Sequence, residues 1–234
     1  MASDVEARIR AIIQRTYNVK SFRIEAGEAA DYKAGQFLSV ALKTEPPLKR
    51  YLSISSSPTE KGYIEFTKKI TESDFSKVLD GLKPDDTVKI QYPFGKFTLG
   101  DAKTKIAFLS GGIGITPIRS ICKYVVDKRL DVDIVLVYAN RTIKDIVFRE
   151  DFELMQKAYP GLRVSHVLSE PAEGFKCCLG RIDRQVIINE IPDYKERNFY
   201  LCGPPAMVEA MKKTLSIELG LSENNIITEN FQGY

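Results

Sequence analysis

Hydrophobic and polar residues alternate in short segments along the first hundred residues. Several segments carry β-branched or aromatic residues at every second position, which is typical of half-buried strands. One segment, Asp74 to Leu82, instead has its apolar residues at helical spacing. Short strands with a single helix predict a small antiparallel barrel, because closure removes exposed sheet edges. The expected strands are Val5–Arg15, Val19–Glu25, Gln36–Leu42, Tyr51–Ser55, Tyr63–Ile70 and Thr87–Gln91.

The pattern changes at Gly100-Asp101-Ala102. Apolar runs of strand length then alternate with helical stretches, of which Pro205 to Leu219 is the clearest. This alternation predicts a doubly wound α/β domain with a parallel sheet. We therefore expect two domains, residues 1–100 and 101–234, since 234 residues can bury two cores. The strands expected in the second domain are Lys105–Ser110, Asp133–Tyr138, Arg163–Leu168, Asn198–Cys202 and Ile226–Phe231.

A glycine-rich segment, Gly111-Gly112-Ile113-Gly114-Ile115-Thr116-Pro117, follows an expected strand and opens a helical stretch. Glycines let the backbone turn tightly and approach a ligand, and Pro117 suits the first turn of a helix. A strand that leads through glycines to a helix N-terminus presents free amides to an anion. The segment favours a dinucleotide pyrophosphate, with a plain glycine turn as the alternative.

Composition changes this picture little. Hydrophobic residues make up 44% and charged residues 28%, as in soluble globular proteins. No apolar run approaches the roughly 20 residues that cross a bilayer, and the first residues lack the pattern of a signal peptide. The net charge of +3 arises from residues 1–99, with 16 Lys and Arg against 13 Asp and Glu. We expect a cytoplasmic protein without a membrane span and without a nucleic-acid partner.

The cysteines and the single histidine do not suggest a metal site. Cys122, Cys177, Cys178 and Cys202 lack the spacing of a disulfide scaffold, a zinc site or an iron–sulfur cluster. His166 lies in an alternating, strand-like segment and is expected to be structural.

Five segments, taken in order, carry the functional assignment. They are Arg50-Tyr51-Leu52-Ser53, Phe75-Ser76, Pro93-Phe94-Gly95-Lys96-Phe97, the glycine-rich segment and Cys202-Gly203-Pro204-Pro205. The chain then ends at Glu229-Asn230-Phe231-Gln232-Gly233-Tyr234. This order and spacing resemble the ferredoxin–NADP reductase family, in which a flavin-binding barrel precedes a pyridine-nucleotide domain. The resemblance covers essentially the whole chain.

The resemblance implies that the first segment holds the flavin. Arg50 would neutralise the flavin pyrophosphate, and Ser53 would lie beside flavin N5. Leu52 stands where the family commonly has a tyrosine that covers the ring, so we expect it to pack on the flavin or its ribityl chain. Tyr51 would face elsewhere, toward the adenine, or be an ordinary strand aromatic.

Ser76 resembles the family serine that meets the flavin phosphates at a helix start. Family members usually have glycines just before it, whereas this chain has Glu72, Ser73 and Asp74. Two carboxylates near a diphosphate are unfavourable unless they turn outward, and Asp74 is also a candidate for the helix N-cap. FAD is the expected cofactor, with FMN as the alternative.

The resemblance also assigns the nucleotide site. Gly111, Gly112, Gly114, Thr116 and Pro117 would cradle the pyrophosphate of NADH or NADPH. Cys202 would approach the nicotinamide as a positioning group, with Gly203 and Pro204 forming the turn into the next helix.

The terminal residues complete the assignment. Glu229 resembles the family's terminal carboxylate, and Tyr234 its terminal aromatic, which stacks on the flavin and swings aside for nicotinamide. Phe231 is an alternative for the stacking role. The residues expected around the reacting atoms are Ser53, Cys202 and Glu229.

Ser169-Glu170-Pro171 stands where NADP-type members carry a Ser-Arg pair. A carboxylate repels a 2′-phosphate and suits a ribose hydroxyl, which favours NADH. Arg141 and Lys176 are near in sequence and keep NADPH open.

The resemblance predicts a reductase that takes a hydride from NAD(P)H onto flavin N5. No cluster or haem domain is attached, so the electrons are expected to leave for a separate soluble acceptor: ferredoxin, flavodoxin or an oxygenase component. The alternatives are a reductase of free flavin, ferric chelate or quinone, and an electron-transfer subunit of a larger complex.

Overall fold

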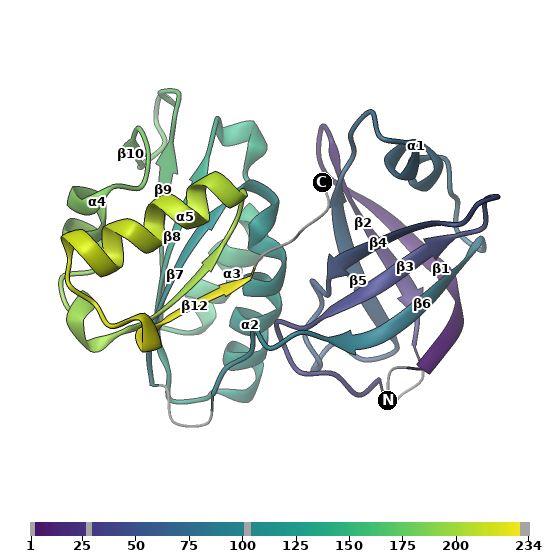
Figure 1. Ribbon diagram of the computed structural model, residues 1–234, viewed down its shortest axis with the longest axis horizontal. Helices are drawn as coiled ribbons and strands as arrows, with labels where there is room; N and C mark the ends of the chain where they lie inside the picture. Colours follow the sequence, from purple (N-terminus) through teal and green to yellow (C-terminus); the bar gives the residue numbers. More distant parts are fainter. Residues whose placement is uncertain (1–2, 27–29, 101–103, 230–234) are drawn as a thin grey trace.

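The computed structural model describes residues 3–26, 30–100 and 104–229. Two six-stranded sheets lie side by side, one antiparallel and one parallel (Figure 1). The antiparallel sheet ends at Phe94 and the parallel sheet begins at Lys105. The predicted fold class, a small antiparallel barrel followed by a parallel α/β domain, is confirmed.

Six antiparallel strands form the first domain, in the order β4-β3-β6-β1-β2-β5. An antiparallel bridge between Ile54 and Phe66 joins the two ends of this order and closes the barrel. The helix α1 (Asp74–Asp80) packs Phe75 and Leu79 into the barrel core. The strands are β1 (Ser3–Thr16), β2 (Val19–Glu25), β3 (Phe37–Leu42), β4 (Leu48–Ser53), β5 (Tyr63–Lys69) and β6 (Thr87–Phe94).

The second domain has a parallel sheet in the order β10-β9-β8-β7-β11-β12. The chain runs outward from β7 in one direction and returns on the other side through β11. The gap between the ends of β7 and β11 is therefore the topological switch point, where such sheets bind ligands. The strands are β7 (Lys105–Gly111), β8 (Asp133–Asn140), β9 (Leu162–Leu168), β10 (Cys178–Leu179), β11 (Asn198–Cys202) and β12 (Ile226–Glu229).

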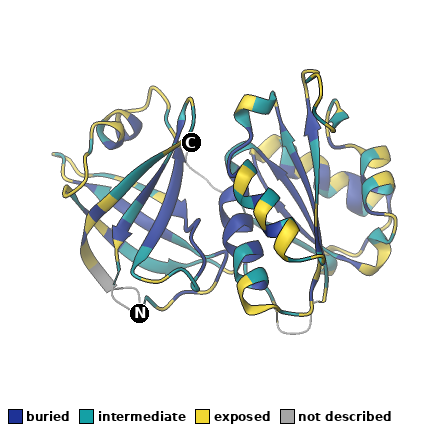
Figure 2. Cartoon of the chain, turned by 180° about the vertical axis from the view of Figure 1, so that it is seen from behind, coloured by how far each residue is buried: buried dark blue, intermediate teal, exposed yellow. Residues whose placement is uncertain are grey.

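Helices cover both faces of this sheet. The helices α2 (Ile115–Lys128) and α3 (Arg149–Ala158) lie on the face toward the barrel, and α4 (Arg184–Glu190) and α5 (Pro205–Lys213) lie on the opposite face (Figure 1). Residues 115–122 of α2 are all buried, since the helix has the sheet on one side and the barrel on the other (Figure 2). The described helices include none long and apolar enough to span a membrane.

Several element boundaries differ from the sequence prediction. The N-cap of α1 is Ser73, whose hydroxyl accepts from the Ser76 amide, so Asp74 is the first helical residue rather than the cap. The helix α5 ends at Lys213, and a π-helical turn, Thr214–Glu218, continues it toward Leu219. The alternation that predicts a strand says nothing about such caps and turns, which local hydrogen bonds decide.

Candidate cofactor site

The glycine-rich segment forms a tight turn between β7 and α2. Residues Gly112–Gly114 make one 3₁₀ turn, and Gly112 has a φ of +52°, in the left-handed region that favours glycine. The Tyr138 hydroxyl donates to the Gly112 carbonyl oxygen over 3.0 Å, and the Thr116 hydroxyl donates to the Ile113 carbonyl oxygen over 3.1 Å. Thr116 thus stabilises the turn itself, while Pro117 lies in the first turn of α2.

The other two glycines of this turn are closely packed, Gly114 against backbone and Gly111 against a side chain. A Cβ atom on Gly114 would lie 2.5 Å from the Cys202 carbonyl carbon and 2.6 Å from the Gly203 amide nitrogen. A Cβ atom on Gly111 would collide with the Met207 sulfur of α5. Glycine at position 114 lets the start of α2 lie close against the end of β11 at the switch point.

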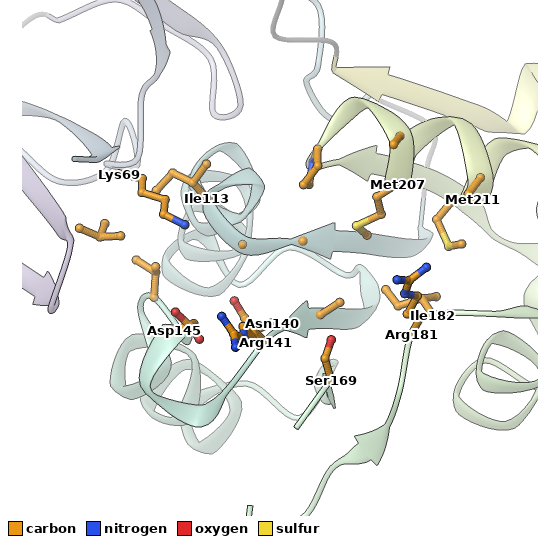
Figure 3. A pocket seen from close by; sticks show the side chains of 18 of the residues that line it. Lys69, Ile113, Asn140, Arg141, Asp145, Ser169, Arg181, Ile182, Met207 and Met211 are labelled. Carbon is orange, nitrogen blue, oxygen red and sulfur yellow. The ribbon is translucent and has the colours of Figure 1, made fainter. Parts of the chain in front are cut away.

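A cleft of about 680 Å³ opens beside this turn (Figure 3). Its volume is within the range of small-molecule and cofactor sites. The glycine turn and the ends of β8 and β9 line one side, and α5 lines the other with Met207 and Met211. Polar side chains gather at its edge: Asn140, Arg141, Asp145, Ser169 and Arg181.

Asn140 gives this cleft a side-chain amide that makes no well-formed hydrogen bond to the described residues. It is the last residue of β8, it is 7% exposed, and it lines the cleft. Its amide lies near the Tyr138 hydroxyl, but neither amide atom makes a well-formed hydrogen bond within the described residues. Because buried polar groups are normally paired, the cleft fits a ligand that has hydrogen-bonding groups, as a nucleotide does.

The barrel supplies the remaining wall of the cleft. Tyr17, Asn18 and Lys69 line it, and the Tyr17 hydroxyl donates to Asp145 Oδ1 across the domains over 2.8 Å. Lys69 extends from the end of β5 to a position near Ile113 of the glycine turn (Figure 3). A cation close to this turn suits a pyrophosphate. In the sequence, Lys69 was one charged residue of a strand, and no motif distinguished it from its neighbours.

Glu170 and Arg141 form an ion pair beside the cleft. Arg141 Nε donates to Glu170 Oε1 over 2.7 Å, and both side chains are largely exposed. Arg141, one of the two cations that keep NADPH open in the sequence, is thus paired with Glu170. Arg181 also lines the cleft and forms no ion pair with any acidic residue in the described ranges.

Cations gather on the barrel near α1. The Arg50 guanidinium lies 5.7 Å from the centre of the Phe75 ring and donates to the Lys49 carbonyl oxygen, and it pairs with no described acidic side chain. Burial, and next the positive charges of Arg50 and Lys69, lower the pKa of Lys68. Such a concentration of positive charge fits a phosphate-containing cofactor at this end of β4 and β5.

Tyr51 and Leu52 point to opposite sides of β4. Leu52 is 8% exposed and belongs to the barrel core, whereas Tyr51 is 52% exposed and contacts Phe37 and Phe94 edge-on. The open aromatic surface is therefore that of Tyr51, although the sequence favoured Leu52 as the residue that packs on the flavin. Ser53 is 4% exposed at the end of the strand.

Ser76 is buried in the first turn of α1. Its hydroxyl lies 3.1 Å from the hydroxyl oxygens of both Thr71 and Ser73. These contacts satisfy the Ser76 hydroxyl locally, so its role toward a flavin phosphate stays a prediction.

Cys202 and Glu229 lie side by side at the ends of β11 and β12. They are paired in the parallel register, and Glu229 adds to the effect of burial in raising the pKa of the Cys202 thiol well above its usual range. Glu229 also reaches the barrel, because a Cβ atom on Gly95 would lie 3.9 Å from Glu229 Oε2 and 2.7 Å from the Phe37 ring. Glu229 thus connects Cys202, its neighbour in the sheet, with the barrel at Gly95 and Phe37.

Two other expectations concern the terminus and metals. Tyr234 and Phe231 lie outside the described residues, so their stacking role stays a prediction. Within the described ranges, no three His, Cys, Asp or Glu side chains group as metal ligands. His166 lies between Tyr138 and Phe175, with ring centres 6.0 and 5.2 Å away.

Glu229 is expected to make stability depend on pH. Burial raises its pKa from 4.5 to about 7, so the folded chain holds a proton that the unfolded chain has lost. The contribution of Glu229 to the free energy of unfolding is therefore largest below about pH 4.5 and falls as the pH rises to about 7. Because Glu229 is only partly buried, we expect Glu229→Gln to melt about 2–4 °C above the wild type at pH 8, roughly 1 kcal/mol. The two should melt together at pH 4.5; melting curves that stay parallel from pH 4.5 to 8 would contradict a raised pKa.

Two family models match the chain and together cover most of it. One, described as an oxidoreductase FAD-binding domain, matches residues 6–99, and the other, described as an oxidoreductase NAD-binding domain, matches residues 108–213. The expected FAD and pyridine-nucleotide binding is confirmed at the level of the domain family.

Similar proteins include reductases. The glycine betaine monooxygenase reductase subunit of Pseudomonas aeruginosa is 31% identical over 215 residues, which are 87% of this chain and 58% of that protein. NADH-cytochrome b5 reductase 1 of Dictyostelium discoideum is 30% identical over 177 residues, 74% of this chain and 62% of that protein. The chain thus spans about 60% of the length of these curated relatives.

A solved structure shares the fold over nearly its full length. The ferredoxin NADP+ reductase from Neisseria gonorrhoeae, with bound FAD and NADP, has a TM-score of 0.85 at 20% identity, over 98% of this chain and 99% of that one. The matching domains occur in the order that the five sequence segments predict. The chain belongs to the ferredoxin–NADP reductase family.

Proposed function

We propose that this chain oxidises NADH at FAD bound to the barrel and delivers the electrons to a separate redox protein. The observation that carries the proposal is the place of Glu229, which is paired in register with Cys202 at the end of β11 and reaches the barrel at Gly95, beside the Phe37 ring.

When bound, the flavin accepts a hydride, two electrons with one hydrogen nucleus, from the nicotinamide ring. The protein's residues bind and orient. Arg50 neutralises the flavin diphosphate, and the turn from Gly111 to Thr116 holds the pyrophosphate of the nucleotide with Lys69. Ser53 offers a hydroxyl at the barrel side of the reacting atoms.

Cys202 and Glu229 act by position and by protonation. The buried thiol of Cys202 has a raised pKa, so it stays neutral and is a spacer beside the nicotinamide rather than a nucleophile. Glu229, with a pKa raised to about 7, can hold or release a proton near neutral pH at the same place.

The Arg141–Glu170 pair favours NADH over NADPH. The Glu170 carboxylate repels a 2′-phosphate and engages Arg141, a cation of the cleft that could receive one. NADH-cytochrome b5 reductase 1, one of the relatives, is named for the same nucleotide.

Glu170→Gln is expected to relax this preference. The change removes the repulsion and releases Arg141, so the dissociation constant for NADPH should fall about 3- to 5-fold, the scale of an exposed charge pair of up to about 1 kcal/mol. The constant for NADH should change less than twofold. Anaerobic titration of both nucleotides against Glu170→Gln, with Glu173→Gln as the control on the same loop, measures the effect. Equal NADPH affinity in the two variants would count against Glu170.

The oxygenase reductase subunit among the relatives favours a protein acceptor, such as ferredoxin, flavodoxin or an oxygenase component.

The function is tested on the purified chain loaded with FAD. We expect a yellow protein with one FAD and no iron, bleached anaerobically by NADH faster than by NADPH. Reoxidation should be fast with a ferredoxin or flavodoxin and slow with free flavin, ferric chelate or quinone. A protein that neither nucleotide bleaches would overturn the proposal. Fast reoxidation by small acceptors alone would mean that the electrons go to a small molecule and not to a redox protein.

A further inference from the structure

One buried arginine of the nucleotide domain, Arg119, bonds directly to the barrel. It lies on α2 and is 5% exposed. Its guanidinium pairs with Glu60, with Nη2 to Glu60 Oε1 at 3.2 Å, and donates through Nη1 to the Ser55 carbonyl oxygen over 3.1 Å. On the other side, Nε donates to Asp151 Oδ2 of α3 over 2.9 Å. One side chain therefore links both domains through charge-assisted hydrogen bonds.

The segments that Arg119 links are those that hold the two cofactors. Ser55 comes two residues after Ser53, at the end of the strand assigned to the flavin. Arg119 itself comes in the second turn of α2, the helix that the glycine turn opens. Glu60 is fixed in its own loop, because its Oε2 accepts from the Ser57 amide over 2.7 Å and its Oε1 from the Tyr63 hydroxyl over 2.9 Å.

Neighbouring contacts continue this connection along α2. The Ser120 hydroxyl donates to the Ser56 carbonyl oxygen over 2.5 Å, and the Thr59 hydroxyl donates to Asp127 Oδ2 over 2.5 Å. The loop from Ser55 to Glu60 thus lies along one side of the helix for about two turns. Of these residues, only Arg119 joins α2 to α3 and also contacts the loop twice, at Ser55 and at Glu60.

We propose that Arg119 is a positioning residue for hydride transfer, which sets the separation and angle between the nucleotide turn and the flavin strand. A planar guanidinium with fixed donor directions suits this role, because each of its bonds is directional. Hydride transfer is sensitive to such geometry, since a misplacement of about 1 Å can cost about 100-fold in rate. The proposal rests on the proposed function, and it gives Arg119 no contact with either cofactor.

The test compares Arg119→Lys and Arg119→Met with the wild type in the FAD-loaded full chain. Lys128→Met, an exposed change on the same helix, is the control. Stopped-flow reduction by NADH gives the limiting rate and the NADH dissociation constant separately. We expect the rate to fall about 10- to 100-fold in Arg119→Met and less in Arg119→Lys, with the dissociation constant within threefold and FAD content unchanged. Small-angle scattering of the oxidised protein without NADH should show a larger radius of gyration for Arg119→Met than for the wild type, Arg119→Lys and Lys128→Met.

A double variant, Arg119→Met with Glu60→Met, separates geometry from stability. Removing Glu60 with Arg119 avoids leaving the Glu60 carboxylate buried and unpaired, and Asp151 keeps Arg15 at 3.9 Å, so the double variant should fold even if Arg119→Met does not. We expect it to keep the reduced rate and the larger radius. A double variant with the wild-type rate and radius would overturn the proposal, as would Arg119→Lys and Arg119→Met that lose FAD but are reduced at the normal rate per bound FAD. If NADH and NADPH fail to reduce the wild type, the proposed function fails instead.

Discussion

Gly114→Ala should lower the melting temperature by about 4–10 °C and weaken nucleotide binding at least tenfold. A Cβ atom at this position would lie 2.5 Å from the Cys202 carbonyl carbon and 2.6 Å from the Gly203 amide nitrogen, and both atoms belong to the backbone. Only a displacement of α2 from the end of β11 can relieve the contact, which costs about 1–3 kcal/mol. In a chain of this size, each kcal/mol corresponds to about 2–4 °C. The displacement would also deform the cleft, so calorimetric titration with NAD+ should detect it.

Gly112→Ala is the matched control for this variant. Nothing lies within 4 Å of the Cβ position on Gly112, so an alanine there meets only the strain of a φ of +52°. That strain costs about 1 kcal/mol, and nucleotide binding should be affected less than in Gly114→Ala. If Gly112→Ala proved the more damaging of the two, close packing would not be the reason for glycine at position 114.

Arg50→Ala should weaken FAD binding by about 10- to 150-fold. The expected loss is that of charge-assisted hydrogen bonds to the diphosphate, roughly 1.5–3 kcal/mol. Arg50 forms no ion pair with the described residues, so the stability of the FAD-free protein should change little. Quenching of FAD fluorescence during titration of the FAD-free protein gives the dissociation constant.

Lys89→Ala provides the comparison for Arg50→Ala. Lys89 is exposed on β6, and its removal takes away one positive charge of the barrel without touching the cationic cluster of Arg50, Lys68 and Lys69. FAD affinity should fall in Arg50→Ala and hold in Lys89→Ala. Equal losses would mean that the overall charge of the barrel attracts FAD and that Arg50 has no specific contact with the diphosphate.

The fold could be predicted because its signals are local. Alternation at every second position and short apolar runs are both properties of neighbouring residues. They predict the strands Val19–Glu25 and Asn198–Cys202 with the bounds that the structure has. The boundaries that were wrong depend on hydrogen bonds between residues a few positions apart. The Ser73 hydroxyl, for example, reaches the Ser76 amide, which makes Ser73 rather than Asp74 the cap of α1.

The candidate site could be predicted only where one segment carries a pattern. The glycine turn and the pair Cys202-Gly203 belong to such segments. Lys69, Asn140 and Arg119 do not, because each is an ordinary residue of a strand or helix until the other elements surround it. Lys69 enters the cleft only because the barrel lies against the nucleotide domain, and Arg119 is buried for the same reason.

By itself, the sequence determined the two domains, their order and the residue types at the turns, since these follow from local periodicity and from the backbone freedom of glycine. The tertiary structure alone decided which residues from distant segments share the site. Closure of the barrel buried Leu52 and left Tyr51 open, and the parallel register placed Glu229 beside Cys202. Burial and electrostatics depend on distances in space, so the raised pKa of Glu229 and the pairing of Arg119 with Glu60 exist only once both domains are packed.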